Sequence, residues 1–138
     1  MTARIDEYRV GQRVTARRAF SDADVRAFAD LSGDHNELHL DDAAAARSRF
    51  GRRLVHGMLT ASLFTRLIGM ELPGRGTIYM QQSLRFTAPV FLDEEVEAVV
   101  EVASIDAVRR RMSLTTTVSK TADGTPVLTG EALVLVEG

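Results

Sequence analysis

The segment Gly57-Met-Leu-Thr-Ala-Ser-Leu-Phe-Thr-Arg-Leu-Ile-Gly-Met-Glu71 is the most apolar stretch with helical character in the chain. Its apolar residues cover most of the circumference of a helix, so we expect the helix to be buried on several sides. At a rise of 1.5 Å per residue, its fifteen residues span about 22 Å. Pro73-Gly74 ends it. The rest of the fold must therefore supply apolar surfaces that enclose this helix.

Downstream of this helix the apolar residues change to a period of two. Within residues 78–86 the apolar Ile78, Met80, Leu84 and Phe86 alternate with more polar residues, which predicts a half-buried strand. Residues 96–105, 108–120 and 127–136 predict three further strands, and Asp123-Gly124 is a hairpin signal. Antiparallel strands after one buried helix predict an α+β fold whose sheet curls around that helix.

Upstream of the helix the pattern predicts three shorter elements. Residues 10–20 form a first strand, and Ser21 can cap an amphipathic helix that ends near Leu31, before Ser32-Gly33. Asp41 or Asp42 can cap a short helix over residues 43–47. Residues 1–138 are expected to form a single domain, since 138 residues suffice for one core.

Composition narrows the class of protein. A hydrophobic share of 45% and a charged share of 26% are ordinary for a soluble globular protein, and a net charge of −2 gives no case for nucleic-acid binding. The lack of cysteine excludes disulfides, thiol catalysis and thiolate metal sites. The N-terminus has no apolar signal core, and residues 54–70 carry Arg66 and are too short to span a bilayer. We therefore expect a cytoplasmic enzyme or binding protein without membrane contact.

Asp34 and His39 are the strongest candidates for chemistry. Five residues apart, they would diverge by about 140° on a helix and lie on opposite faces of a strand. They converge only in an irregular segment, which the turn-forming Ser32-Gly33-Asp34 and the nearby Asn36 permit. A carboxylate and an imidazole suit general acid–base work. The alternative is structural: Asp34-x-x-Glu37 also fits a capping box, and a loop histidine can simply be solvated.

Gly57 is the next candidate, because it stands where the main helix begins. A helix N-terminus offers free N–H groups and a positive dipole end, and a residue without Cβ lets a carbonyl oxygen approach them as in an oxyanion hole. The alternative is that glycine is common at helix ends for backbone reasons alone. The neighbouring His56 is interpreted as structural or substrate-adjacent.

Two other groups of residues have weaker functional meanings. The three histidines lack a strong metal-ligand spacing, so no metal is expected; they are His35, His39 and His56. Four arginines precede the main helix, at positions 47, 49, 52 and 53. Such arginines are most often a solvated face, or they can contact the phosphates of a carrier such as coenzyme A.

Three motifs resemble those of the R-specific enoyl-CoA hydratases of the MaoC-like dehydratase family. They are Phe28-Ala-Asp-Leu-Ser-Gly-Asp34-x-Asn36-x-Leu38-His39, Val55-His-Gly-Met-Leu-Thr-Ala-Ser-Leu-Phe64, and residues 79–91 ending in Thr-Ala-Pro-Val-Phe. The resemblance spans nearly the whole chain, including the spacing between motifs. It implies a hot-dog fold and a homodimer whose sheets join edge to edge, with active sites near the interface.

The resemblance also implies an activity: reversible syn addition of water to trans-2-enoyl-CoA, giving (3R)-3-hydroxyacyl-CoA. Asp34 and His39 match the catalytic pair, and the Gly57 N–H matches the donor to the thioester oxygen. Asn36 matches a loop-ordering residue, Thr65 a hydroxyl residue near the site, and Ile68 is expected to line the acyl pocket. No cofactor or metal is expected, since coenzyme A is part of the substrate.

The chain departs from the family pattern at two places and leaves rival functions open. Glu37 replaces the usual proline after Asn36, and Arg53 stands where relatives often have proline, so loop rigidity and carrier preference are in question. The rivals are a dehydratase acting on acyl carrier protein thioesters, a hot-dog thioesterase and a non-catalytic subunit. The Asp34/His39 spacing favours the hydratase over the thioesterase, and the intact pair argues against the non-catalytic subunit.

Overall fold

A computed structural model of the chain describes residues 2–137. A short 3-10 helix, η1 (Ile5–Glu7), precedes the first strand. The first half of the chain then forms β1 (Arg13–Ala19), α1 (Asp22–Ser32), α2 (Glu37–Leu40), α3 (Asp42–Arg47) and α4 (Gly57–Met70). The second half forms β2 (Thr77–Gln82), β3 (Arg85–Phe86), β4 (Glu95–Asp106), β5 (Arg111–Lys120) and β6 (Pro126–Val136).

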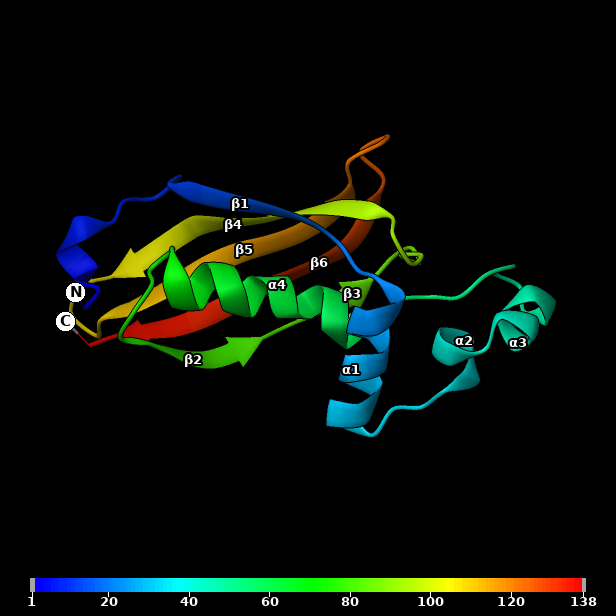
Figure 1. Ribbon diagram of the computed structural model, residues 1–138. Helices are drawn as coiled ribbons and strands as arrows, with labels where there is room; N and C mark the ends of the chain where they lie inside the picture. The colour runs from blue at the N-terminus through cyan, green and yellow to red at the C-terminus, as the bar shows by residue number, and fades with distance from the viewer. Residues whose placement is uncertain (1, 138) are drawn as a thin grey trace.

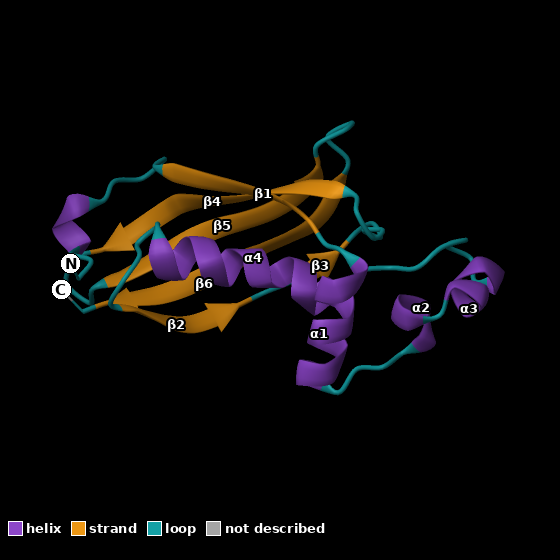
Figure 2. Ribbon diagram, in the orientation of Figure 1, coloured by secondary structure: helices purple, strands orange, loops and turns teal. Residues whose placement is uncertain are grey.

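One antiparallel sheet curves around α4, which crosses its concave face (Figures 1 and 2). The strand order is β1-β4-β5-β6-β2, with β3 also paired to β6. The helices α1, α2 and α3 lie beyond one end of α4, which is its N-terminal end (Figure 1). This is the predicted α+β arrangement of a central helix wrapped by a curved antiparallel sheet.

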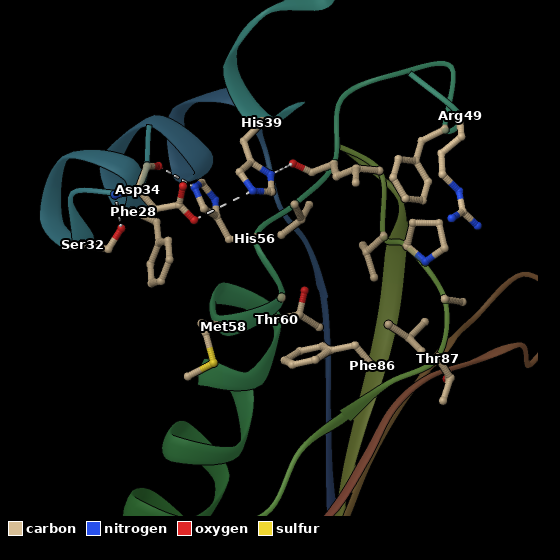
Figure 3. A pocket seen from close by; sticks show the side chains of 18 residues that line it. Phe28, Ser32, Asp34, His39, Arg49, His56, Met58, Thr60, Phe86 and Thr87 are labelled. Carbon is tan, nitrogen blue, oxygen red and sulfur yellow. Dashed lines mark hydrogen bonds and ion pairs between the residues drawn. The ribbon is translucent and has the colours of Figure 1, made fainter. Parts of the chain in front are cut away.

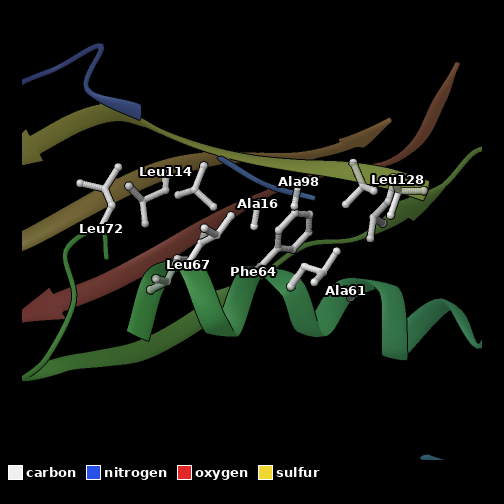
Figure 4. Packing of buried hydrophobic residues seen from close by; sticks show 14 of the residues in the cluster. Ala16, Ala61, Phe64, Leu67, Leu72, Ala98, Leu114 and Leu128 are labelled. Carbon is white, nitrogen blue, oxygen red and sulfur yellow. The ribbon is translucent and has the colours of Figure 1, made fainter. Parts of the chain in front are cut away.

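The core lies between α4 and the sheet. Phe64 and Leu67 are buried on the helix face that meets Ala16, Ala98 and Leu114 of the strands (Figure 4). The opposite face of α4 is open, because Met58 and Met70 are more than half exposed. The expectation of burial on several sides is therefore correct for the sheet-facing side only. Among residues 2–137, no helix has both the length and the hydropathy needed to cross a membrane.

The predicted strand over residues 78–86 differs most from the structure. It forms two strands, β2 and β3, and its register against β6 shifts between Tyr79 and Gln81. The side chains of Ile78, Met80 and Phe86, which alternation placed on a buried face, are 44%, 43% and 51% exposed. The reason is position: α4 packs mainly on β1, β4 and β5, so the apolar face that alternation marks on β2 and β3 is left uncovered by the protomer.

The strand predicted from residue 108 begins later. Residues 107–110 form a turn between β4 and β5, in which Arg110 has a positive φ of 55° and Val108 is 95% exposed. Val108 therefore lies in the turn of the hairpin between these two long strands. Its apolar side chain is typical of a strand, which is why the sequence pattern placed the start of the strand there.

Candidate active site

A cavity of about 670 Å³ opens at the N-terminal end of α4. Its wall comes from α1, α2 and the loop between them, from the connector before α4 and the first turn of α4, and from β3 with the segment after it; it includes Phe28, Asp34, His39, Gly57 and Phe86 (Figure 3). Its volume falls in the range of small-molecule sites, and its lining is mostly apolar with a few polar groups at one end.

Asp34 lies in the loop that follows α1. Gly33 ends α1 with a left-handed φ of 83°, a conformation that glycine adopts without strain. The Asp34 N–H then donates to Ser32 Oγ at 3.1 Å, and Asp34 Oδ1 accepts from the Asn36 N–H at 3.1 Å. The helix cap is Asn36, whose Oδ1 accepts from the Leu38 N–H at 3.0 Å. The capping-box interpretation of Asp34 is therefore wrong, and the loop-ordering role expected of Asn36 agrees with these bonds.

His39 lies on α2, a four-residue helix that the sequence pattern did not predict. Its Nδ1 is 2.8 Å from the Leu54 carbonyl oxygen, and because a carbonyl only accepts, Nδ1 carries a proton. In the neutral ring Nε2 is then an acceptor, and it lies 4.0 Å from Asp34 Oδ2 (Figure 3). The predicted pair thus converges, with the carboxylate half exposed and the imidazole 14% exposed.

His56 packs directly behind this pair. Its ring stacks on the His39 ring with centroids 3.8 Å apart, and its Nε2–H donates to the Asp34 carbonyl oxygen at 3.0 Å. Burial lowers the pKa of His56, and the nearby His39 acts in the same direction although the bond to Asp34 opposes it. A 2% exposed ring that also lines the cavity suits the structural or substrate-adjacent role expected of His56.

Gly57 is the first residue of α4 and lines the cavity. The preceding residue, His56, makes no side-chain cap hydrogen bond, so no side chain occupies the N–H groups that start the helix. A Cβ on Gly57 would lie 2.7 Å from Cε1 of Phe86. Close packing against Phe86 therefore requires glycine at position 57. The absence of a side chain there also keeps the helix N-terminus open, as the oxyanion-hole hypothesis needs.

Thr65, expected near the active site, and Ile68, expected at the acyl pocket, are not part of the cavity wall in the protomer. Thr65 is exposed on α4, and Ile68 is 1% exposed in the core cluster. They lie eight and eleven residues beyond Gly57, about 12 and 16 Å along the helix. Thr60, which sequence reasoning missed, lines the cavity instead, and its buried hydroxyl has no hydrogen-bond partner in the described part of the chain.

The four arginines before α4 have separate environments. Arg49 lines the cavity, and the Arg52 guanidinium lies 3.9 Å from the centroid of the Phe91 ring. Arg53 is 9% exposed and is bonded to Asp22. Arg47 alone, exposed at the end of α3, fits a solvated face without further contacts. The set is therefore not one phosphate-binding patch.

A metal fits the cluster poorly. Asp34, His39 and His56 each offer one ligand atom, and these atoms lie within 4.8 Å of one another. The two imidazole rings are stacked with centroids 3.8 Å apart and an interplanar angle of 25°, so the two ring planes do not meet close to the rings. A histidine binds a metal through a lone pair in the plane of its ring, and this stacking is unfavourable for one ion bound by both rings. The arrangement suits proton transfer better than metal binding.

Comparison with known proteins places this site in a family. Residues 6–124 match the family model described as MaoC like domain. The chain belongs to this family. It is 50% identical over 125 residues to the (R)-specific enoyl-CoA hydratase of Aeromonas caviae, which covers 91% of this chain and 92% of that protein. It is 42% identical over 131 residues to the 3-hydroxybutyryl-CoA dehydratase of Methylorubrum extorquens, covering 95% of this chain and 82% of the relative.

The solved structures agree with this MaoC-like assignment. The (R)-hydratase from A. caviae involved in PHA biosynthesis superimposes with a TM-score of 0.91 at 47% identity, over 94% of this chain and 97% of that one. The hot-dog fold expected from the sequence motifs is therefore confirmed.

Proposed function

We propose that the protein is an (R)-specific enoyl-CoA hydratase that reversibly adds water to trans-2-enoyl-CoA thioesters. The observation that carries the proposal is the convergence of Asp34 and His39 on the cavity that also contains the N-terminus of α4. The hydratase and dehydratase relatives, of which one is 50% identical, support the same hydro-lyase chemistry.

The spacing of the pair suits one water molecule. A separation of 4.0 Å is too long for a direct hydrogen bond, but it lets one water oxygen lie about 2.8 Å from each group. Asp34 Oδ2 and His39 Nε2 both accept, so they hold the water through its two protons. The pair takes one proton as the oxygen attacks C3, and a proton returns to C2 from the same face. One O–H bond of the water and the π bond between C2 and C3 break, while a C3–O bond and a C2–H bond form.

The thioester oxygen is the place where negative charge develops during this step. An N–H at the start of α4, contributed by Gly57, can donate to that oxygen, and the helix dipole favours the enolate. Because the thioester itself acidifies C2, the reaction requires no cofactor and no metal, and none is part of this proposal.

The substrate is a short or medium acyl thioester of coenzyme A. The apolar wall formed by residues such as Phe28, Phe86 and Val90 suits an acyl chain, and Arg49 supplies a guanidinium at the same cavity for a phosphate of the carrier. Acyl carrier protein presents the same phosphopantetheine arm, so the carrier is decided by the experiment below.

We further propose that the enzyme is a cytoplasmic homodimer. Large apolar side chains are exposed on neighbouring elements, and they are Met58, Met70, Ile78, Tyr79, Met80 and Phe86. Most lie on β2 and β3, where an edge strand offers unpaired backbone groups to a second copy. Met58 and Phe86 also line the cavity, so a partner covering this face would complete the acyl pocket. That would bring Thr65, on the exposed face of α4, close to the interface.

The test is loss of the enoyl-thioester absorbance with crotonyl-CoA, followed by chiral analysis of the product. Loss of the band with a (3R) product is expected. Loss only with a crotonyl carrier protein would move the assignment to dehydration in lipid synthesis. Release of free thiol without alcohol would contradict the hydratase and indicate a thioesterase.

A further inference from the structure

Arg53 connects three helices beneath the catalytic pair. Its Nε donates to the main-chain carbonyl oxygen of His39 at 2.7 Å, and one terminal nitrogen donates to Asp22 Oδ1, at the start of α1, at 2.6 Å. Its other terminal nitrogen lies 3.8 Å from Asp42 Oδ1, at the start of α3. The Arg53 side chain is 9% exposed, whereas Asp22 and Asp42 are 52% and 91% exposed.

Burying a guanidinium is unfavourable unless its donors are satisfied, so this position is demanding for an arginine. The planar fork of arginine places donors on separate nitrogens, so that Nε donates to the His39 carbonyl while a terminal nitrogen donates to the Asp22 carboxylate, whereas all the donors of lysine lie on one nitrogen. Arg53 therefore links several groups through specific hydrogen bonds, and one of these groups is the main-chain carbonyl of His39.

The segment that carries His39 needs external support. With four residues, α2 is far too short to be stable alone. Its last carbonyl oxygens accept hydrogen bonds from residues outside the helix. The Leu38 carbonyl accepts from the Leu54 N–H, the His39 carbonyl from Arg53, and the Leu40 carbonyl from Arg26 at 3.5 Å. At its N-terminal end the first helical residue is Glu37, which leaves φ free, whereas a proline at this position would fix it.

We propose that Arg53 is a positioning residue, which holds His39 in reach of Asp34. Its contact at the C-terminal end of α2 makes the helix rigid, which Glu37 at the N-terminal end does not do. The proposal rests on the proposed hydratase function for its kinetic readout, but not for its structural one. Glu37 and Arg53 act on opposite ends of the same helix, because Glu37 is its first residue and Arg53 donates to the His39 carbonyl in its last turn.

The first experiment compares Arg53→Met with wild type. We expect kcat for crotonyl-CoA to fall about 10- to 10²-fold, as for other small misplacements of catalytic groups, with KM nearly unchanged. Amide hydrogen exchange should become faster over residues 36–40. Arg17→Met is the matched control, because Arg17 pairs with Glu97 at 2.9 Å on the strands, away from α2. The control should keep both the wild-type kcat and the wild-type exchange over these residues.

The second experiment is a rescue by Glu37→Pro. Proline is compatible here, since Glu37 is the first residue of α2 and Asn36 before it has φ −55° and ψ 131°. Glu37→Pro should recover at least about 3-fold of the kcat lost in Arg53→Met and restore slow exchange, while changing the otherwise wild-type enzyme little. Arg53→Lys, which keeps the positive charge and a long aliphatic stem, is measured in parallel as a variant less prone to unfolding the region, and it should show a smaller loss with the same rescue.

Two results would overturn the proposal. One is wild-type kcat and wild-type exchange over residues 36–40 in folded Arg53→Met or Arg53→Lys. The other is a loss that Glu37→Pro does not reduce in either variant, which would give Arg53 a role unrelated to α2 rigidity. If the wild-type protein hydrates no enoyl thioester, the proposed function fails, and hydrogen exchange still decides whether Arg53 holds α2.

Discussion

At the catalytic pair, the Asp34 carboxylate is held by a neighbouring residue and the His39 ring by a group remote from it in sequence. Asp34 is fixed by its own loop and by the buried His56, and the His39 ring is fixed by the Leu54 carbonyl. These contacts leave one carboxylate oxygen and one ring nitrogen free to face the same space at 4.0 Å. The chemistry therefore depends on the two side chains, and their geometry depends on their neighbours.

Removing either member of the pair should slow turnover. For Asp34→Asn or His39→Ala we expect kcat to fall at least about 10²-fold, since positioned proton transfer contributes that much or more. Steady-state hydration of crotonyl-CoA measures the effect, and circular dichroism confirms folding. Near-normal turnover in a folded variant would remove that residue from the mechanism.

His56 should make stability depend on pH. Burial lowers its folded-state pKa below the ordinary value of about 6.5, so the unfolded chain binds the proton more readily. Its contribution to stability is full above pH ~6.5 and is lost as the pH falls toward the lowered pKa. Urea unfolding between pH 7.5 and about 5 should show a smaller decline with pH for His56→Phe, which keeps an aromatic ring at this position.

The comparison variant for this pH experiment is His35→Gln. The bond to Asp30 raises the pKa of the exposed His35, so its contribution has the opposite sign and is lost as the pH rises through the raised pKa. Removing His35 should therefore leave the acid-side decline in place. An identical pH profile for His56→Phe and wild type would show that His56 is not the source.

At the scale of elements, α2 and α4 contrast in how they are stabilised. The helix α2 depends on end contacts, namely the Asn36 cap and the outside donors to its carbonyls. The helix α4 depends on apolar burial, with Leu63, Phe64 and Leu67 packed into the core cluster. Changes to α2 should therefore act through backbone restriction, and changes to α4 through lost packing.

Glu37→Pro alone should stabilise the protein by about 0.4–1 kcal/mol, because proline at a compatible position lowers the entropy of the unfolded chain. The first helical position requires no N–H donor, so no intrahelical bond is lost. Chemical denaturation of wild type and variant measures the difference. A lower midpoint would mean that the loop needs an N–H or a φ that proline cannot supply.

Leu63→Ala should destabilise the protein by about 2–5 kcal/mol, the usual range for removing a buried leucine. Leu63 is 5% exposed on the sheet-facing side of α4, whereas Ser62 beside it is exposed. Ser62→Ala is therefore the matched control on the same helix, with little expected effect. An unchanged midpoint for Leu63→Ala would contradict the burial.

For the whole molecule, the exposed apolar face on β2, β3 and α4 is the feature that the protomer leaves unexplained. Met80→Asp on the edge strand β2 should convert the proposed dimer to monomers, since burying a carboxylate in an apolar interface is unfavourable. Light scattering measures the mass, and activity should fall with dissociation because Met58 and Phe86 link this face to the cavity. A wild-type monomer with full activity would contradict the shared interface.

The sequence by itself determined most of the elements and the candidate chemistry, although it missed α2 and the division of residues 78–86 into β2 and β3. Helix caps and breaks such as Ser21 and Gly33, and period-two alternation along β4, depend only on local backbone and side-chain preferences, so the predicted ranges agree closely. The family motifs also singled out Asp34, His39 and Gly57, and the structure brings all three to one cavity.

Only the tertiary structure decided which groups meet and which faces stay open. The His39 ring is oriented by Leu54, fifteen residues away, and Arg53 reaches Asp22 across thirty-one. Alternation marked Ile78 and Met80 as apolar-face residues but could not show that the protomer leaves them exposed. The physical reason is that a periodic pattern reports a preference for burial, whereas the partner and the distance follow from how remote segments pack.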